Sequence, residues 1–202
     1  IRTKISTAIT INDKNVQVII ELKWVDNENI LITGSINPSV SGYAVYNIKS
    51  KADLISCEGT LRDVTIYKKN ILYSNTPHIY PQPKANLYIN ANKIFEVSNA
   101  AEEIFDGVMS KDSKMIAFRS WIGNGKDSNS IKSAYLNIAN INSNGTALRN
   151  LKKIPISGDT TGYLEFDDKN NINIIGDEFI YKLNDGKLIK EKNTLPKPAE
   201  LT

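Results

Sequence analysis

The chain of 202 residues contains one cysteine, Cys57, and one histidine, His78. A single cysteine excludes an intrachain disulfide, and a single histidine excludes multi-histidine zinc sites and the His-Glu-x-x-His motif of metalloproteases. A catalytic thiol or a Ser-His-Asp triad would have to use His78, and the chain has no Gly-x-Ser-x-Gly elbow. Alternation places Cys57 in a strand, where we expect a small buried side chain.

Long hydrophobic runs and an excess of one charge are also missing. No stretch approaches 18 apolar residues, so we expect no transmembrane segment. Lys and Arg number 25 against 22 Asp and Glu, a net charge of +3, and this balance argues against a nucleic-acid partner. The chain begins at Ile1 rather than Met, so we expect that it has been trimmed, and a removed leader or lipid anchor stays open.

The abundance of Asn, Ile and Lys favours a low-GC bacterial source. We expect an extracytoplasmic location or association with the cell envelope, with a cytoplasmic location as the alternative. The sequence says nothing about the oligomeric state.

The feature that is present is a repeat. Four segments share an apolar residue, a turn of Asp, Asn, Ser and Lys, and then a β-branched or aliphatic run. They span residues 22–32, 64–73, 108–118 and 164–175. The polar residues suit tight turns, because they tolerate left-handed backbone and form local hydrogen bonds, and the flanking residues suit a pleated surface.

Each unit continues into an aromatic-containing third strand, at residues 42–48, 85–90, 134–141 and 178–183. A fourth strand is predicted in three units, at residues 53–58, 93–97 and 148–156. Trp24, Ile66 and Met109 follow one another at intervals of 42 and 43 residues, and Phe166 follows after 57. A period of roughly 40 to 45 residues with four strands per unit is typical of propeller blades.

The third unit reads Ser-Lys-Asp-Ser-Lys-Met-Ile-Ala-Phe from Ser110 and continues into Tyr-Leu-Asn-Ile from Tyr135. Over residues 108–141 it resembles the WD40-like repeat of TolB-type β-propellers. That repeat typically reads Ser-Pro-Asp-Gly, two polar residues and Ile-Ala-Phe, so Lys111 replaces Pro and Ser113 replaces Gly. The resemblance implies a fold and carries over no catalytic residue.

We therefore predict an all-β, propeller-like domain over residues 1–192, with about four blades of three to four antiparallel strands and an extended tail at 193–202. The last blade could be closed by an N-terminal strand at residues 3–11 or by its own segment 187–191. The predicted number of blades is compatible with a complete small propeller and with part of a larger one. The register predicts that four residues before the hairpin turns are buried on one face: Trp24, Ile66, Met109 and Phe166. Residues 99–105 could form one helical turn or continue into a strand.

Two loop motifs resemble ligand sites without completing them. The glycine-containing residues 123–128 lack the spacing of a phosphate-binding loop and precede no helix, so we interpret them as a surface loop. Residues 26–28 and 167–171 resemble calcium loops, but they lack the central Gly and the distal Glu, and hairpin turns explain them. The sequence thus predicts no metal and no cofactor.

Two connections, residues 74–84 and 119–132, are longer than a hairpin requires, and such loops usually have a use or are disordered. Prolines stiffen the first, and glycines permit adjustment of the second. We predict that both contribute to a binding surface. Its candidate residues are the aromatic, histidine and polar side chains of these loops: His78, Tyr80, Trp121, Asn124 and Lys126.

The sequence favours a non-enzymatic binding domain that presents loops for recognition of a protein at the bacterial cell envelope. The alternative is a hydrolase, or the propeller module of a peptidase or of a glycan-active enzyme. A spacer or sensor domain without a concave site is a third possibility. The enzyme hypothesis requires acidic side chains such as Asp63, Asp106, Glu165 and Asp177 to converge on one cavity.

Overall fold

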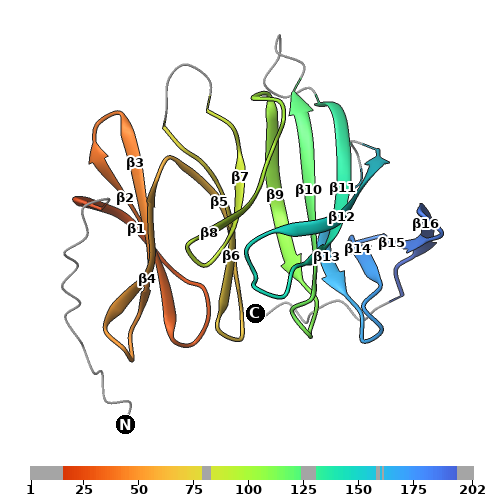
Figure 1. Cartoon of the computed structure of the whole chain (residues 1–202), viewed down its shortest axis with the longest axis horizontal. Helices are drawn as coiled ribbons and strands as arrows, with labels where there is room; N and C mark the ends of the chain where they lie inside the picture. Colours follow the sequence, from red (N-terminus) through yellow and green to blue (C-terminus); the bar gives the residue numbers. More distant parts are fainter. Residues whose placement is uncertain (1–15, 79–82, 124–130, 158–159, 161, 195–202) are drawn as a thin grey trace. The chain divides into compact units, whose positions relative to one another are not determined.

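Sixteen β-strands make up the regular structure of the described part of the chain. The computed structural model describes residues 16–78, 83–123, 131–157, 160 and 162–194. The strands form four four-stranded antiparallel sheets, each a meander in chain order, and the described residues contain no helix (Figure 1). The predicted all-β fold of about four antiparallel sheets is therefore confirmed. The chain divides into two compact units, residues 1–60 and 61–202, and the prediction of a single domain over residues 1–192 stays a prediction.

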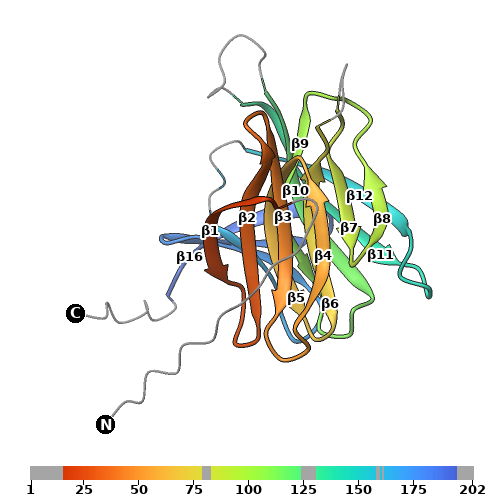
Figure 2. The same ribbon diagram turned by 90° about the vertical axis from the view of Figure 1, so that its left-hand side faces the viewer.

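The first unit contains one sheet. Its strands are β1 (Val18–Trp24), β2 (Asn29–Asn37), β3 (Val40–Asn47) and β4 (Ala52–Glu58). Figure 2 shows β1 at one edge of this sheet and β4 at the other. The core of the unit is small and aliphatic, with one aromatic ring: Val16, Ile30, Ile32, Ala44 and Tyr46.

The second unit contains three sheets. The first consists of β5 (Thr60–Tyr67), β6 (Asn70–Thr76), β7 (Asn86–Ile89) and β8 (Asn92–Glu96). The second consists of β9 (Glu102–Met109), β10 (Met115–Gly123), β11 (Ile131–Ile141) and β12 (Leu148–Ile156). The third consists of β13 (Tyr163–Phe166), β14 (Ile172–Ile175), β15 (Phe179–Asn184) and β16 (Lys187–Lys192). Predicted segment 187–191 thus supplies the fourth strand of the last sheet, while residues 3–11 and 195–202 lie outside the described residues.

The sheet β9–β12 buries apolar side chains on both of its faces. Phe118 belongs to a cluster with Leu72 and Leu87 of the preceding sheet. Its neighbour Ala117 points the opposite way, as alternation requires, and joins a second cluster with Leu164 of the following sheet. Ala117 and Phe118, which are adjacent in β10, are both fully buried. Burial on both faces explains why the predicted repeat reads as a continuous apolar run here instead of alternating.

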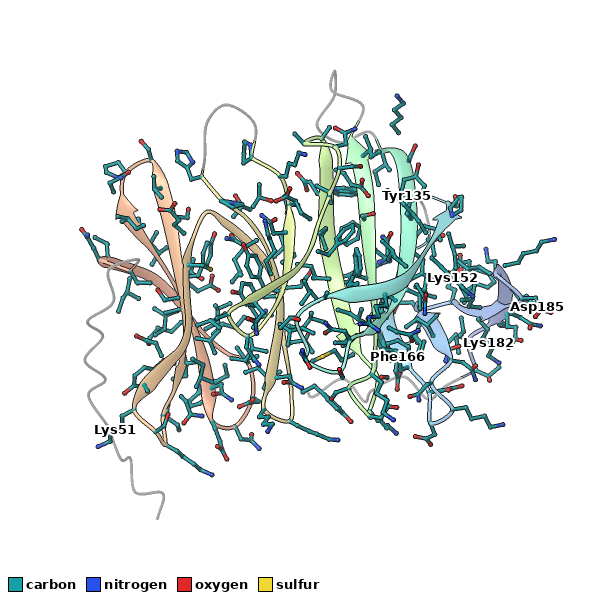
Figure 3. The ribbon with its side chains drawn as sticks, in the orientation of Figure 1. Lys51, Tyr135, Lys152, Phe166, Lys182 and Asp185 are labelled. Atoms are coloured by element: carbon teal, nitrogen blue, oxygen red, sulfur yellow. The ribbon has the colours of Figure 1, made fainter. Side chains whose placement is uncertain are left out.

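The four predicted core positions do not share one environment. Met109 and Phe166 are buried, with 7% and 6% of their surface exposed, and Phe166 is labelled at the end of β13 in Figure 3. Ile66 is partly buried. Trp24 is 59% exposed, so the prediction for this residue is wrong. It pairs with buried Ile30, but every residue of the edge strand β1 is exposed.

Side chains of the hairpin turns satisfy the backbone of those turns. Asp26 Oδ1 accepts hydrogen bonds from the backbone N–H groups of Glu28, at 2.7 Å, and Asn29, at 2.9 Å. Asp167 Oδ1 accepts from the N–H groups of Lys169 and Asn171, both at 2.8 Å. These are Asx turns, and they support the sequence interpretation that turn chemistry, rather than calcium binding, accounts for the acidic loops.

The turn of the third unit is built differently. Ser110 Oγ donates to Asp112 Oδ1 at 2.7 Å, and Met115 N–H donates to Ser110 Oγ at 2.9 Å. Ser113 has a φ of 59°, a left-handed conformation in which glycine is more common. Ser113 is the residue that stands in place of Gly in the repeat that the sequence resembles, and it adopts the left-handed conformation without being glycine.

Several predicted boundaries need correction. Strand β10 continues through Gly123 and β11 begins at Ile131, so residues 119–123 and 131–132 of the predicted loop 119–132 belong to strands; Arg119 still pairs with Leu136. Residues 102–105 belong to β9, and the helical alternative is wrong. Cys57 is half-buried in β4. Among the described residues, no helix is long and apolar enough to cross a membrane.

The contrast between Phe166 and Trp24 gives a stability prediction. We expect Phe166→Ala to lower the free energy of unfolding by roughly 3 to 5 kcal/mol, because it leaves a cavity between sheets. Trp24→Ala should lower it by less than about 1 kcal/mol, because the side chain is exposed. Urea denaturation followed by circular dichroism at low protein concentration measures both. Equal losses in the two variants would contradict the observed burial.

The Asx turns predict a pH dependence. The hydrogen bond from the Asn171 side chain, with the two backbone N–H groups, lowers the pKa of Asp167 against the opposing effect of burial. A lowered folded-state pKa contributes stability above the unfolded pKa, and this contribution is lost as the pH falls through the folded value. We expect wild type to lose more stability than Asp167→Asn between pH 6 and roughly pH 3. Parallel curves of unfolding free energy against pH for the two proteins would refute this role.

Candidate functional site

A surface pocket of about 480 Å³ opens between the β6–β7 connection and the start of β9. Three of its lining residues, Thr76, Pro83 and Ala85, flank the connection that the sequence predicted as a binding loop. Five consecutive residues, 99–103, form the facing wall. The pocket therefore lies at the foot of the predicted loop and within the second unit.

The facing wall is held in place by local hydrogen bonds. Ala101 N–H donates to Asn99 Oδ1, and Glu102 N–H donates to the Asn99 carbonyl oxygen, both at 2.9 Å. Across the pocket, Val97 N–H donates to the Ala85 carbonyl at 3.1 Å. Because the turn and the neighbouring strand are both tied, the pocket is preformed, and a ligand would meet little entropic cost from ordering this wall.

Glu102 belongs to a network of hydrogen-bonded polar side chains that extends across the sheet β9–β12. Only 4% of Glu102 is exposed. Its Oε1 accepts hydrogen bonds from Ser120 Oγ and Lys153 Nζ, both at 2.6 Å, and Asn137 Nδ2 donates to Ser120 Oγ at 2.9 Å. Lys153 Nζ lies 4.2 Å from the ring centroid of Tyr135, which is labelled in Figure 3. The carboxylate is thus paired and hydrogen-bonded, as burial of a charge requires.

Glu103 contacts Trp121, one of the predicted binding residues. Its Oε2 accepts a hydrogen bond from Trp121 Nε1 at 3.0 Å and pairs with Arg62 at 2.8 Å. The Trp121 ring also packs on Phe105, with centroids 5.0 Å apart. Trp121 is half-buried, so its ring supports the wall of the pocket.

Asn86 lies directly behind the pocket-lining Ala85. It is buried, and its Nδ2 donates to the Lys84 carbonyl at 2.9 Å. Its Oδ1 accepts no hydrogen bond from the residues that the structure describes.

The other predicted binding residues are less informative. His78 is exposed, two residues beyond the pocket-lining Thr76. Tyr80, Asn124 and Lys126 lie outside the described residues. The structure therefore does not test whether the predicted residues form one surface.

A second polar cluster surrounds Arg119. This side chain is 8% exposed. Its Nη1 donates to the Thr160 carbonyl at 3.0 Å, and its Nη2 donates to the Gly162 carbonyl at 2.7 Å and pairs with Asp106. Burial lowers the pKa of the guanidinium, and the negative charge of Asp63 opposes this shift. Arg119 thus connects β10 to the residues that precede β13.

Asp106 extends the cluster to the preceding sheet. Its backbone N–H donates to Asp63 Oδ2 at 2.7 Å. Asp63 and Asp106 occupy equivalent positions 43 residues apart, and both have left-handed backbone, with φ of 46° and 54°. The first strands of two successive sheets are therefore linked at the same point of the repeat.

The acidic residues named by the enzyme hypothesis do not converge on the described pocket. Asp63 and Asp106 are joined to each other and to Arg119, whereas Glu165 and Asp177 are exposed. None of the four lines the pocket. No group of three His, Cys, Asp or Glu side chains within the described part of the chain is arranged to hold a metal.

Sequence reasoning missed the Glu102–Glu103 wall, because residues 99–105 could equally be read as a helical turn. One signal was available: Glu102 and Ile104 alternate on one face of a strand, and a glutamate beside a buried isoleucine needs a cationic partner. The partner Lys153 is 51 residues away, so only the fold identifies it.

No protein-family model matches the chain. No curated protein is similar to it at a significant level.

Solved structures with a similar arrangement exist. The β-propeller domain of the Trilobed protease from Pyrococcus furiosus, described as having an open velcro topology, is 14% identical, with a TM-score of 0.44 over 88% of this chain and 56% of that one. An acylaminoacyl peptidase from Pyrococcus horikoshii is 13% identical, with a TM-score of 0.47 over 86% of this chain and 32% of that one. A luciferin-regenerating enzyme is 10% identical, with a TM-score of 0.27 over 88% and 77%. This chain spans about half the length of the first of these proteins.

The Arg119 cluster predicts an asymmetry between buried and exposed ion pairs. We expect Arg119→Ala to lower the free energy of unfolding by roughly 3 to 5 kcal/mol, because Asp106 and two carbonyl groups lose their donor. Lys182→Ala is the matched control, because Lys182 pairs with Glu191 and both side chains are half exposed; its loss should stay below about 1 kcal/mol. Similar midpoints of chemical denaturation for both variants would show that Arg119 is not a structural tie.

Proposed function

We propose that the chain is a non-catalytic recognition domain that binds an exposed segment of a partner protein at the bacterial cell envelope. The binding site is the pocket between Thr76, Ala85 and residues 99–103, together with the connections that follow β6 and β10. The observation that supports this best is the position of the pocket, at the foot of a loop that is longer and more proline-rich than a hairpin requires.

The state of the charged side chains favours binding over catalysis. A general acid or base must be able to exchange a proton with a substrate. Glu102 is occupied by Lys153 and Ser120, and Glu103 by Arg62 and Trp121. The two glutamates therefore stabilise the wall of the pocket, and the pocket would bind a ligand through its shape and through hydrogen bonds.

The same pairing indicates the kind of partner. The two wall glutamates are each matched by a cation, so the pocket presents no strong net charge to a ligand. Its remaining lining consists of small or short side chains, which leave room for a side chain or a turn of the partner. We expect an uncharged, partly apolar loop or extended segment, with little dependence of affinity on salt.

The geometry of the third-unit turn supports the TolB-type assignment of the repeat. Ser110 and Asp112 close the turn, and left-handed Ser113 stands at the glycine position. The alternative function, a propeller module of a hydrolase or peptidase, would use the same pocket to hold a substrate for an active site supplied elsewhere. No feature of the described residues favours that alternative over recognition alone.

A pocket-filling variant tests the proposal. Ala101 lines the pocket and is itself exposed, so Ala101→Trp should fill the pocket without disturbing the core. Peptides would be selected on wild type from a displayed random library and measured by titration. We expect at least a tenfold loss of affinity in Ala101→Trp, corresponding to about 1.4 kcal/mol.

The matched control is Asn140→Trp, which places the same side chain at an exposed position of β11. It should leave the affinity of the selected peptides unchanged. Failure to enrich any peptide, or equal affinity for wild type and Ala101→Trp, would refute the pocket as the recognition site.

A further inference from the structure

Strand β1 is a sheet edge that exposes large apolar side chains. Its large hydrophobic residues Val18, Ile19, Ile20, Leu22 and Trp24 are between 48% and 70% exposed. In the described structure its sheet has the order β1-β2-β3-β4, so β1 has a strand neighbour on one side only. Proteins usually protect such an edge with charge, proline, shortness or a cover, because it is a template for another strand.

The free edge carries hydrogen-bonding groups at defined residues. Val25 N–H donates to the Asn29 carbonyl at 2.9 Å. In an antiparallel pair, hydrogen-bonded and non-hydrogen-bonded pairs alternate. Because Val25–Asn29 is a hydrogen-bonded pair, Trp24–Ile30 and Leu22–Ile32 are non-hydrogen-bonded pairs. The backbone N–H and C=O groups of Trp24 and Leu22 therefore point away from β2.

The sequence of β1 is complementary to itself when it is reversed about Leu22. In an antiparallel pair of two β1 strands centred there, Leu22 faces Leu22 and Glu21 faces Lys23 on both sides of the centre. Trp24 then faces Ile20. Glu21 and Lys23 are exposed and form no ion pair with other described residues. The register shift at Ile20 bends the start of β1 and leaves Glu21 to Trp24 in regular pairing.

We propose that β1 is a homodimerisation edge, which pairs antiparallel with β1 of a second copy of this chain about Leu22. The pairing satisfies the outward N–H and C=O groups of Leu22 and forms two symmetric Glu21–Lys23 ion pairs. It also covers Leu22 and Trp24 on one face. A twofold arrangement of this kind is the commonest form of homo-oligomer. The site is separate from the pocket, and it does not depend on the proposed recognition function.

Charge-swap variants test both the edge and its register. Sedimentation velocity over the micromolar concentration range should show a monomer–dimer equilibrium for wild type. Glu21→Lys alone brings an ammonium group opposite Lys23 of the other copy, and Lys23→Glu alone brings a second carboxylate opposite Glu21. Each should weaken dimerisation roughly tenfold, because like charges directly opposite are destabilising.

Two combinations of these substitutions should restore dimerisation. The double variant Glu21→Lys/Lys23→Glu recreates the pairs in reverse and should dimerise like wild type. An equimolar mixture of the two single variants should form heterodimers more readily than either forms homodimers. Leu54→Lys, at a comparably exposed apolar position on the opposite edge strand, should not change dimerisation, and circular dichroism confirms that each variant is folded.

A monomer at all concentrations overturns the proposal, as would be expected if a different protein or a further segment of a longer chain covers β1. A dimer that is insensitive to the single swaps also overturns it, because association then uses another surface.

Discussion

The second unit depends on how the two terminal nitrogens of a buried guanidinium, Arg119, are paired. Arg119 lies in β10, the strand whose neighbouring residues Ala117 and Phe118 are buried on opposite faces. A charge in such a position is strongly unfavourable unless it is paired and hydrogen-bonded. Arg119 finds Asp106 on β9 and two backbone carbonyls before β13, and Asp106 in turn binds Asp63 on β5. A chain of polar contacts therefore connects β5, β9 and β10 to the residues that precede β13.

The same polar contacts give the acidic residues of the repeat a structural role. In a small all-β domain with few histidines and cysteines, acidic residues at equivalent positions of a repeat invite a catalytic interpretation. Here Asp63 and Asp106 link the first strands of two successive sheets, and both have left-handed backbone at this position. Glu102 and Glu103 likewise stabilise the wall of a pocket. The pocket and the loop beside it are the proposed recognition site.

Local patterns were sufficient for most of the fold. The spacing of Ile66, Met109 and Phe166 and the polar turns after them predicted the four sheets and nearly all their strands, because hairpin turns and alternation are encoded by neighbouring residues. Trp24 failed because burial depends on a neighbouring layer, which no local pattern reports. The end of β10 was misplaced because Arg119 and Ser120 look like loop residues until their partners are known. The wall of the pocket depends on Lys153, which is distant in sequence from Glu102. Of the elements around the pocket, only the connection at residues 74–84 could therefore be predicted.

The account rests on Arg119 as the tie between the sheets, and hydrogen exchange followed by mass spectrometry measures that tie directly. Exchange would be compared between wild type and Arg119→Met in native buffer, with peptides that cover residues 102–109, 160–166 and 29–47. The account predicts faster exchange in the first two segments, which lie at the two ends of the Arg119 contacts, and unchanged exchange in β2 and β3 of the first unit. Unchanged protection of residues 102–109 and 160–166 would contradict it.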